Sequence, residues 1–223
     1  VATDGETYGH HHKFGDMALA YTLQYIDSHH DAKLTNFAEY LENFPPKNEV
    51  QIIERTSWSC AHGIERWKSD CGCETGGQPG WNQKWREPLR QALDWLKFRA
   101  DSIFTEAGKG LFKNPWDARN AYICIYNSQL DKNSFLARQS GRDLEMSEKI
   151  IALKLLELQR HSMLMFTSCG WFFNDISGIE TEQILSYAGK VIQLAEDISG
   201  EKLEPHFLEL LEVADSNVLD KSN

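Results

Sequence analysis

Acidic and imidazole side chains gather close to the start of the chain. Asp4 and Glu6 are followed by three consecutive histidines at residues 10–12. Carboxylates and imidazoles at such short spacing are the groups that proton transfer or metal binding requires. If residues 1–3 end a strand, Asp4 follows its C-terminal end, where α/β enzymes place catalytic groups. The alternative is a solvated terminus in which Asp4 only caps a turn and the histidines have no role.

A second group of reactive side chains has the pattern C-x-H…C-x-C, formed by Cys60, His62, Cys71 and Cys73. Three thiols and one imidazole are suitable ligands for tetrahedral zinc, although the C-x-C spacing is shorter than the usual C-x-x-C knuckle. Alternatively, His62 faces a ligand and the thiols pack as small apolar groups, or a disulfide joins Cys60 to Cys71 or Cys73. We expect no metal and no cofactor here, with zinc at these residues as the alternative.

The same cysteines lie in a long segment without helical or strand periodicity, residues 54–85, which holds four of the seven tryptophans of the chain. An irregular segment of this length inside a compact domain is usually functional or disordered. Disordered segments are poor in aromatic residues. We therefore expect an ordered loop that lines a site and presents aromatic faces.

The rest of the chain is expected to be a mainly α scaffold that positions these residues. Helical periodicity predicts helices over residues 14–30, 35–41 (with Thr35 as the cap), 85–104, 115–130, 144–166, 179–198 and 204–213. We expect one helical domain over residues 1–214, a bundle of about six or seven helices. At most one or two very short strands are expected, near residues 1–3 and 50–53. Residues 215–223 are expected to form a polar tail.

Composition narrows the classes of partner. The net charge of -10 argues against nucleic acid and anionic membranes, and it favours neutral ligands such as sugars, or cationic ones. No apolar run reaches the length of a membrane span. The polar start of the chain lacks the pattern of a signal peptide, and five is an odd number of cysteines. We therefore expect a cytoplasmic protein with free or metal-bound thiols.

Four segments, in the right order, resemble glycoside hydrolase family 57. TDGETYGHHH resembles its D-[GT]-E-x-[FY]-G-H motif, and LTNFAEYLENFPPKNEV resembles its "T-L-S-E-Y-L" helix and the strand that follows. TSWSCAHGIERW is similar to its S-W-G-x-x-G…W substrate loop, and TSCGWFF to an S-S-D-W-x-F segment of its helical domain. The likeness covers residues 1 to about 195. It is strongest to a branch whose C-terminal half is catalogued as a domain of unknown function.

The resemblance implies a retaining enzyme of α-glucans, built from a (β/α)7 barrel and a helical domain. Residues 1–13 would then be the end of a barrel strand with its catalytic motif, Asp4 the acid/base, and residues 54–85 the site loop. The nucleophile would be a Glu on an earlier strand, in an N-terminal barrel half of the same protein. The chain alone is therefore expected to be inactive. The implied partners are that barrel half and an oligosaccharide or α-glucan.

The resemblance also implies which residues contact the sugar: Glu6, His11, Ser57, Trp58, His62, Trp67 and Trp171. We expect Trp58 and Trp171 to stack on sugar rings. Trp67 could equally pack between helices. Glu6 and His11 would bind hydroxyl groups or orient Asp4, unless Glu6 pairs with a surface lysine. The aromatic loops 56–81 and 167–178 are expected to share one face, close to Asp4.

Two positions depart from the family pattern. Residues 59–62 replace the Gly that follows Ser-Trp, and Gly170 stands where the family has an Asp. Both changes fall among the implied sugar contacts, so they bear on the substrate more than on the fold. Two other functions remain open: a carbohydrate-binding or scaffold domain without chemistry of its own, and a structural helical domain stabilised by zinc.

Overall fold

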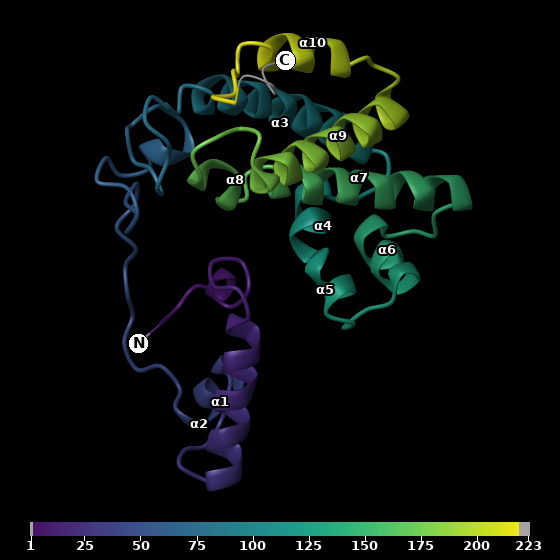
Figure 1. The fold of residues 1–223 in the computed structure, drawn as a ribbon. Helices are drawn as coiled ribbons and strands as arrows, with labels where there is room; N and C mark the ends of the chain where they lie inside the picture. The colour runs from purple at the N-terminus through teal and green to yellow at the C-terminus, as the bar shows by residue number, and fades with distance from the viewer. Residues whose placement is uncertain (1, 219–223) are drawn as a thin grey trace. The chain divides into compact units, whose positions relative to one another are not determined.

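The computed structural model describes residues 2–218 and divides the chain into two compact units, Val1–Ile53 and Glu54–Asn223. Within the described residues the secondary structure is helical and no strand is formed, which confirms the mainly α fold (Figure 1). The expectation of one domain over residues 1–214 stays a prediction.

The first unit contains a short 3-10 helix, η1 Gly5–Thr7, and two α-helices, α1 Gly15–His29 and α2 Phe37–Asn43. Both expected helices are confirmed, but the cap of α2 is Asn36 rather than Thr35. The Asn36 side chain accepts a hydrogen bond from the backbone N–H of Glu39 at 3.0 Å. No strand forms at residues 50–53, which lie in exposed coil.

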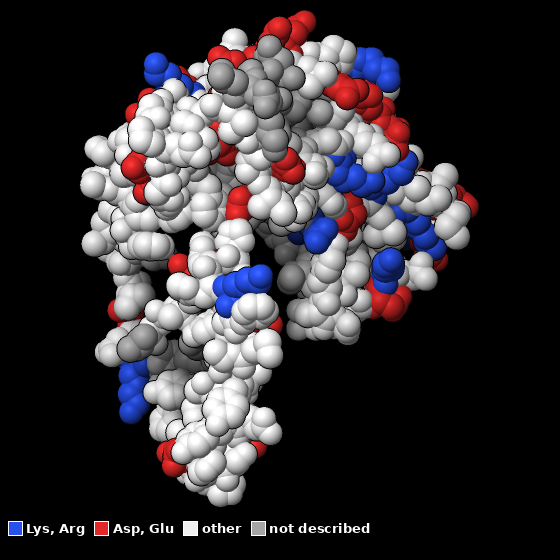
Figure 2. All heavy atoms as spheres, viewed as in Figure 1, with Lys and Arg blue, Asp and Glu red and all other residues white. Residues whose placement is uncertain are grey.

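The first unit has no core of its own. None of its described residues is buried, and Phe37 and Val50 are each 89% exposed. On the face drawn in Figure 2, the surface over α1 is mainly uncharged. The large apolar and aromatic side chains that the described residues of the first unit expose are Tyr8, Phe14, Met17, Tyr21, Leu23, Tyr25, Leu34, Phe37, Tyr40, Leu41, Phe44, Val50, Ile52 and Ile53. Apolar exposure of this extent is typical of a surface that another part covers.

The second unit contains the remaining helices. They are η2 Glu65–Trp67, α3 Arg86–Gly108, α4 Pro115–Ala121, α5 Ile123–Tyr126, α6 Lys132–Ser140, α7 Met146–Leu164, α8 Cys169–Phe172, α9 Ile179–Ser199 and α10 Glu204–Leu211. Helices α3, α7 and α9 pack on one another, and α10 lies along α3 (Figure 1). The helix expected over residues 115–130 is divided into α4 and α5.

The core of the second unit follows from helical spacing. Leu89, Leu93, Leu96 and Ala100 recur every three or four residues along α3 and are fully buried. Helix α7 begins with a capping box, in which Glu145 and Glu148 satisfy each other's backbone N–H groups. No helix among residues 2–218 combines the length and the apolar character that crossing a membrane requires.

The start of the expected polar tail is tied to the fold by Asp175. Its carboxylate accepts a hydrogen bond from the Ser216 hydroxyl at 2.8 Å and another from the Asn217 backbone N–H at 2.6 Å. Residues 219–223 lie outside the described residues. The segment after α10 therefore returns to the loop that follows α8.

Candidate functional site

The N-terminal motif belongs to the first unit. Asp4 precedes η1, and its side chain makes no capping hydrogen bond, although its carbonyl accepts one from the Thr7 N–H at 3.1 Å. Glu6 lies within η1, and its carbonyl accepts the backbone N–H groups of His10 and His11 at 3.1 and 3.0 Å. The carboxylates of Asp4 and Glu6 and the ring of His11 are all on exposed residues. The turn that the sequence predicts is thus formed without the Asp4 side chain.

In the second unit, the ligand atoms of Cys60, His62, Cys71 and Cys73 all lie within 4.8 Å of one another. The Cys60 sulfur is 3.9 Å from that of Cys71 and 3.8 Å from that of Cys73. The Cys73 sulfur is 3.6 Å from the Nδ1 atom of His62. Cys60, Cys71 and Cys73 form no disulfide, so the alternative of a disulfide within this group is not realised. Four side chains separated by up to 13 residues therefore share one small volume.

Two glycines allow the chain to bend around this cluster. Gly63 has a φ of +81°, and a Cβ atom there would lie 2.5 Å from the carbonyl oxygen of Arg55. Gly72, between the two cysteines of the C-x-C pair, has a φ of +77°. Only glycine adopts this left-handed region without strain. Ser57, a predicted site residue, donates its hydroxyl to the Gly63 carbonyl at 2.9 Å and so supports the first bend.

Two cysteines of the cluster, Cys60 and Cys71, have pKa values shifted in opposite directions. Burial raises the pKa of Cys60, but hydrogen bonds from the backbone N–H groups of Arg66 and His62, together with those from the Cys73 and Cys71 thiols, outweigh burial and lower that pKa to about 7. Burial raises the pKa of Cys71. Cys60 therefore becomes a thiolate, the form that binds metals, more readily than Cys71.

Two buried guanidinium groups, those of Arg66 and Arg86, lie beside the cluster, and no sequence motif marks them. Arg66 donates to the Phe172 carbonyl at 3.2 Å, and Arg86 to the Phe173 and Cys73 carbonyls at 3.1 and 3.4 Å. Burial lowers the pKa of Arg86 to about 10. Among the described residues, neither guanidinium forms an ion pair with a carboxylate. No periodicity or motif marks them, because their role depends on contacts between distant loops.

The two aromatic loops meet through these contacts. The indole N–H of Trp67 donates to the Ser168 carbonyl at 3.1 Å, and the Arg66 guanidinium lies 4.3 Å from the centre of the Phe172 ring. The prediction that the two loops share one face is thus confirmed within the second unit. Trp67 is partly buried and packs against the core, which favours the packing alternative for this residue. The position of the loops relative to Asp4, in the other unit, stays a prediction.

The two tryptophans expected to stack on sugars, Trp58 and Trp171, differ in their exposure to solvent. Trp58 is 83% exposed, and its ring lies 6.2 Å from that of Phe172, centre to centre. Trp171 is 1% exposed and stacks on Phe166 at 6.1 Å. A buried indole has no free face for a ligand, so the expected stacking role of Trp171 is corrected to a core role.

The departure at Gly170 has a steric cause. A Cβ atom at this position would lie 2.6, 2.7 and 2.9 Å from three side-chain atoms of Ile184 on α9. The Asp of the family pattern would therefore collide with the core helix. The loop after α7 is packed too closely for a sugar-binding carboxylate at this point.

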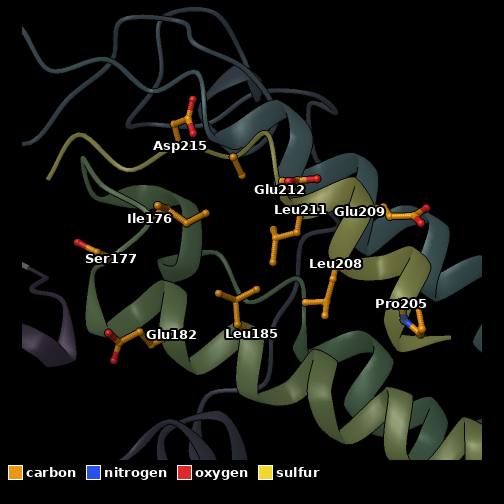
Figure 3. Close-up of a pocket in the computed structure, with 11 residues that line it drawn as sticks. Ile176, Ser177, Glu182, Leu185, Pro205, Leu208, Glu209, Leu211, Glu212 and Asp215 are labelled. Carbon is orange, nitrogen blue, oxygen red and sulfur yellow. The ribbon is translucent and has the colours of Figure 1, made fainter. Parts of the chain in front are cut away.

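A separate open groove of about 670 Å³ lies beside α9 and α10 of the second unit (Figure 3). Leu185, Leu208 and Leu211 give it an apolar floor. Glu182, Glu209 and Asp215 are among the acidic residues around it. None of the predicted site residues lines this groove, and it offers no aromatic face, so we do not assign it to sugar binding.

The fold and the loop define a helical domain with a compact thiol–imidazole cluster beside two joined aromatic loops. The chain belongs to the family described as a domain of unknown function, DUF3536, whose sequence model matches residues 81–223. This match agrees with the expected domain of unknown function in the C-terminal part, and it leaves the link to glycoside hydrolase family 57 as a proposal. No curated protein and no solved structure matches the chain.

Proposed function

We propose that the chain is the C-terminal part of a retaining glycoside hydrolase or glucanotransferase that acts on α-glucans. The ordered resemblance of four segments to glycoside hydrolase family 57 supports this proposal. The single structural observation that carries it is the exposed ring of Trp58 beside Phe172, because Trp58 occupies the position that matches the family's substrate loop.

The Trp58–Phe172 pair is a suitable surface for a neutral sugar. Indole and phenyl faces pack well against the apolar face of a pyranose, and the indole N–H remains available for a hydroxyl group. The Phe172 ring is held in place by Arg66, whose guanidinium lies 4.3 Å from its centre. A rigid aromatic surface binds with less loss of side-chain entropy than a mobile one.

Asp4 is the proposed acid/base. In a double displacement it would donate its proton to the glycosidic oxygen while the nucleophile attacks the anomeric carbon. In the second step it would remove a proton from water, or from a sugar hydroxyl if transfer occurs. The nucleophile must lie about 5–5.5 Å away, and we propose that the N-terminal barrel half supplies it. The Asp4 carboxylate makes no capping hydrogen bond, which leaves it available for this role.

The exposed surface of the first unit supports a covering partner. Its aromatic and aliphatic side chains, such as Phe14, Tyr21 and Phe37, are exposed, and none of its described residues is buried. Exposed apolar area of this kind is favourable to bury against another domain. We propose that the barrel half of the same protein is this partner.

The test is turnover of α-glucan by the full-length protein. Asp4→Asn should abolish turnover and leave oligosaccharide binding nearly unchanged, because the amide keeps the shape of the carboxyl group but has no proton to donate. Asp16→Asn, a change at an exposed Asp in the first turn of α1, is the matched control and should remain active. Residues 1–223 alone should show no turnover.

Three results would contradict the proposal in different ways. Turnover by the Asp4→Asn protein would remove Asp4 from the chemistry. Binding of oligosaccharide without turnover by the wild-type full-length protein would favour the carbohydrate-binding alternative. Turnover by residues 1–223 alone would place the nucleophile within this chain, and Glu54 and Glu65 would be the first residues to test.

A further inference from the structure

We infer that Cys60, His62, Cys71 and Cys73 bind one zinc ion as a structural site. This inference is independent of the proposed sugar chemistry, since it concerns only the thiols, the imidazole and their neighbours.

The distances match a tetrahedral site. With Zn–S bonds of about 2.3 Å and Zn–N bonds of about 2.05 Å, tetrahedral angles require about 3.8 Å between two sulfur ligands and about 3.6 Å between sulfur and nitrogen. The sulfur of Cys60 lies 3.9 and 3.8 Å from those of Cys71 and Cys73, and the Cys73 sulfur is 3.6 Å from the His62 nitrogen. All four ligand atoms lie within 4.8 Å of one another, so one ion placed between them reaches every ligand.

The donor set favours zinc and a closed site. Three thiolates and one imidazole are soft ligands, which select zinc over magnesium, calcium or manganese. Four protein ligands complete a tetrahedral shell, whereas catalytic zinc keeps one position for water or substrate. The site is therefore structural, with no role for the metal as a Lewis acid toward sugar.

The buried arginines beside the cluster have the charge opposite to that of a zinc–thiolate centre. A zinc ion with three thiolates carries a net charge of about -1. Arg86 is fully buried beside the cluster and donates to the carbonyl of Cys73 at 3.4 Å, and Arg66 is buried next to it. Buried cations need compensating negative charge. The thiolate centre supplies that charge where no carboxylate pairs with either guanidinium among the described residues.

The position of the site indicates what the ion does. Residues 60–73 contain only one short 3-10 helix, η2, so few backbone hydrogen bonds hold them. Between the two halves of the cluster lie Arg66 and Trp67, the residues that contact the loop after α7. A metal that joins the two ends of this segment fixes both contacts, and with them the ring of Phe172.

The first experiment measures metal content. The 223-residue chain, purified without a histidine tag, should contain one zinc per chain by mass spectrometry of the metal. Cys60→Ser and Cys73→Ser should each reduce zinc at least tenfold after dialysis against a weak chelator. Cys124→Ser and Cys169→Ser change cysteines outside the cluster and should keep it. Equal zinc in all four variants would place the metal elsewhere, for instance on residues 10–12, and would overturn the inference.

A second experiment remains decisive if the serine variants fail to fold. Co²⁺ exchanged into the wild-type chain should show the intense visible absorption of tetrahedral, thiolate-bound cobalt. His62→Cys should retain the metal with an altered spectrum, because it preserves four soft ligands, whereas His62→Ala should weaken binding. A weak octahedral cobalt spectrum, or wild-type protein that lacks metal and has five titratable thiols, would overturn the inference.

A third experiment tests the effect on the loop. Removal of zinc by a strong chelator should loosen the backbone and make the chain cleavable by trypsin after Lys68, an exposed residue in the middle of the segment, and restored zinc should prevent that cleavage. Unchanged cleavage at Lys68 with and without metal would contradict a structural role. These readouts use no sugar, so failure of the zinc site and failure of the proposed sugar chemistry are separate results.

Discussion

At the scale of single residues, Trp58 and Trp171 illustrate how one residue type serves two purposes. Both have glycine or polar neighbours in the sequence and both match aromatic positions of the family pattern, but Trp58 lies in a turn and Trp171 in the short helix α8. The structure exposes the first and buries the second against Phe166. The same substitution should therefore affect ligand binding at one position and folding at the other.

We expect Trp58→Ala to weaken oligosaccharide binding by the full-length protein by about 1–3 kcal/mol, the value of apolar area that a sugar ring would cover. Its unfolding free energy should remain unchanged. Trp171→Ala should instead lower the unfolding free energy by about 3–5 kcal/mol, because it leaves a large cavity in the core. Calorimetric titration and denaturant unfolding measure the two effects. A Trp58→Ala protein that binds normally would exclude this ring from the sugar site.

The sequence could select candidate residues but could not separate exposed from buried ones. The four side chains of the thiol–imidazole cluster were identifiable from their types and spacing. The exposure of a loop tryptophan depends on which helix passes behind it, and that information is not local. Arg66 and Arg86 are not identifiable from the sequence for the same reason, since the Phe172 and Phe173 carbonyls that they contact are about a hundred residues away.

At the scale of elements, the close approach of α8 to α9 depends on the absence of a side chain at Gly170. A Cβ atom there would meet Ile184 at 2.6 Å, and Ile184 is itself buried. Overpacking of this kind costs about 1–3 kcal/mol. We therefore expect Gly170→Ala to lower the unfolding free energy by about that amount, measured by chemical denaturation.

A control for this substitution lies on α9, the helix that carries Ile184. Gly189 is exposed and has no atom within 4 Å of its potential Cβ, so Gly189→Ala should increase stability by about 0.5–1 kcal/mol through helix propensity alone. In the double variant Gly170→Ala/Ile184→Val, part of the lost stability should return. A Gly170→Ala protein as stable as the wild type would show that the two helices separate at little cost.

Helices were the most predictable elements, because apolar spacing along α3, α7 and α9 identifies them directly. Their ends were less predictable. Adjacent residues Thr35 and Asn36 are both capping types, and only the backbone conformation selects Asn36. The apolar run at residues 50–53 resembles a strand, yet a strand needs a neighbour to supply hydrogen bonds, and sequence alone does not show whether one exists.

At the scale of the whole molecule, the two units differ in how they are stabilised. Every buried residue of the described chain lies at or after Cys60. Residues 54–223 should therefore fold when residues 1–53 are deleted, with an unfolding free energy within about 0.5 kcal/mol of that of the same unit in the intact chain, the size of ordinary surface effects. Circular dichroism during denaturation measures this difference. Loss of cooperative unfolding on deletion would show that the first unit contributes to the core.

The exposed surface of the first unit also has a consequence for biosynthesis. A ribosome adds about 5–20 residues per second, so synthesis of residues 54–223 takes roughly 10–30 s after residue 53 has been added. Throughout that interval, side chains such as Phe37 and Ile52, 89% and 82% exposed, find no core within their own unit. Apolar surface that is exposed during synthesis promotes aggregation. If the proposed barrel half precedes this chain, it would fold first and shield the nascent segment, so the order of translation would protect the protein as well as assemble it.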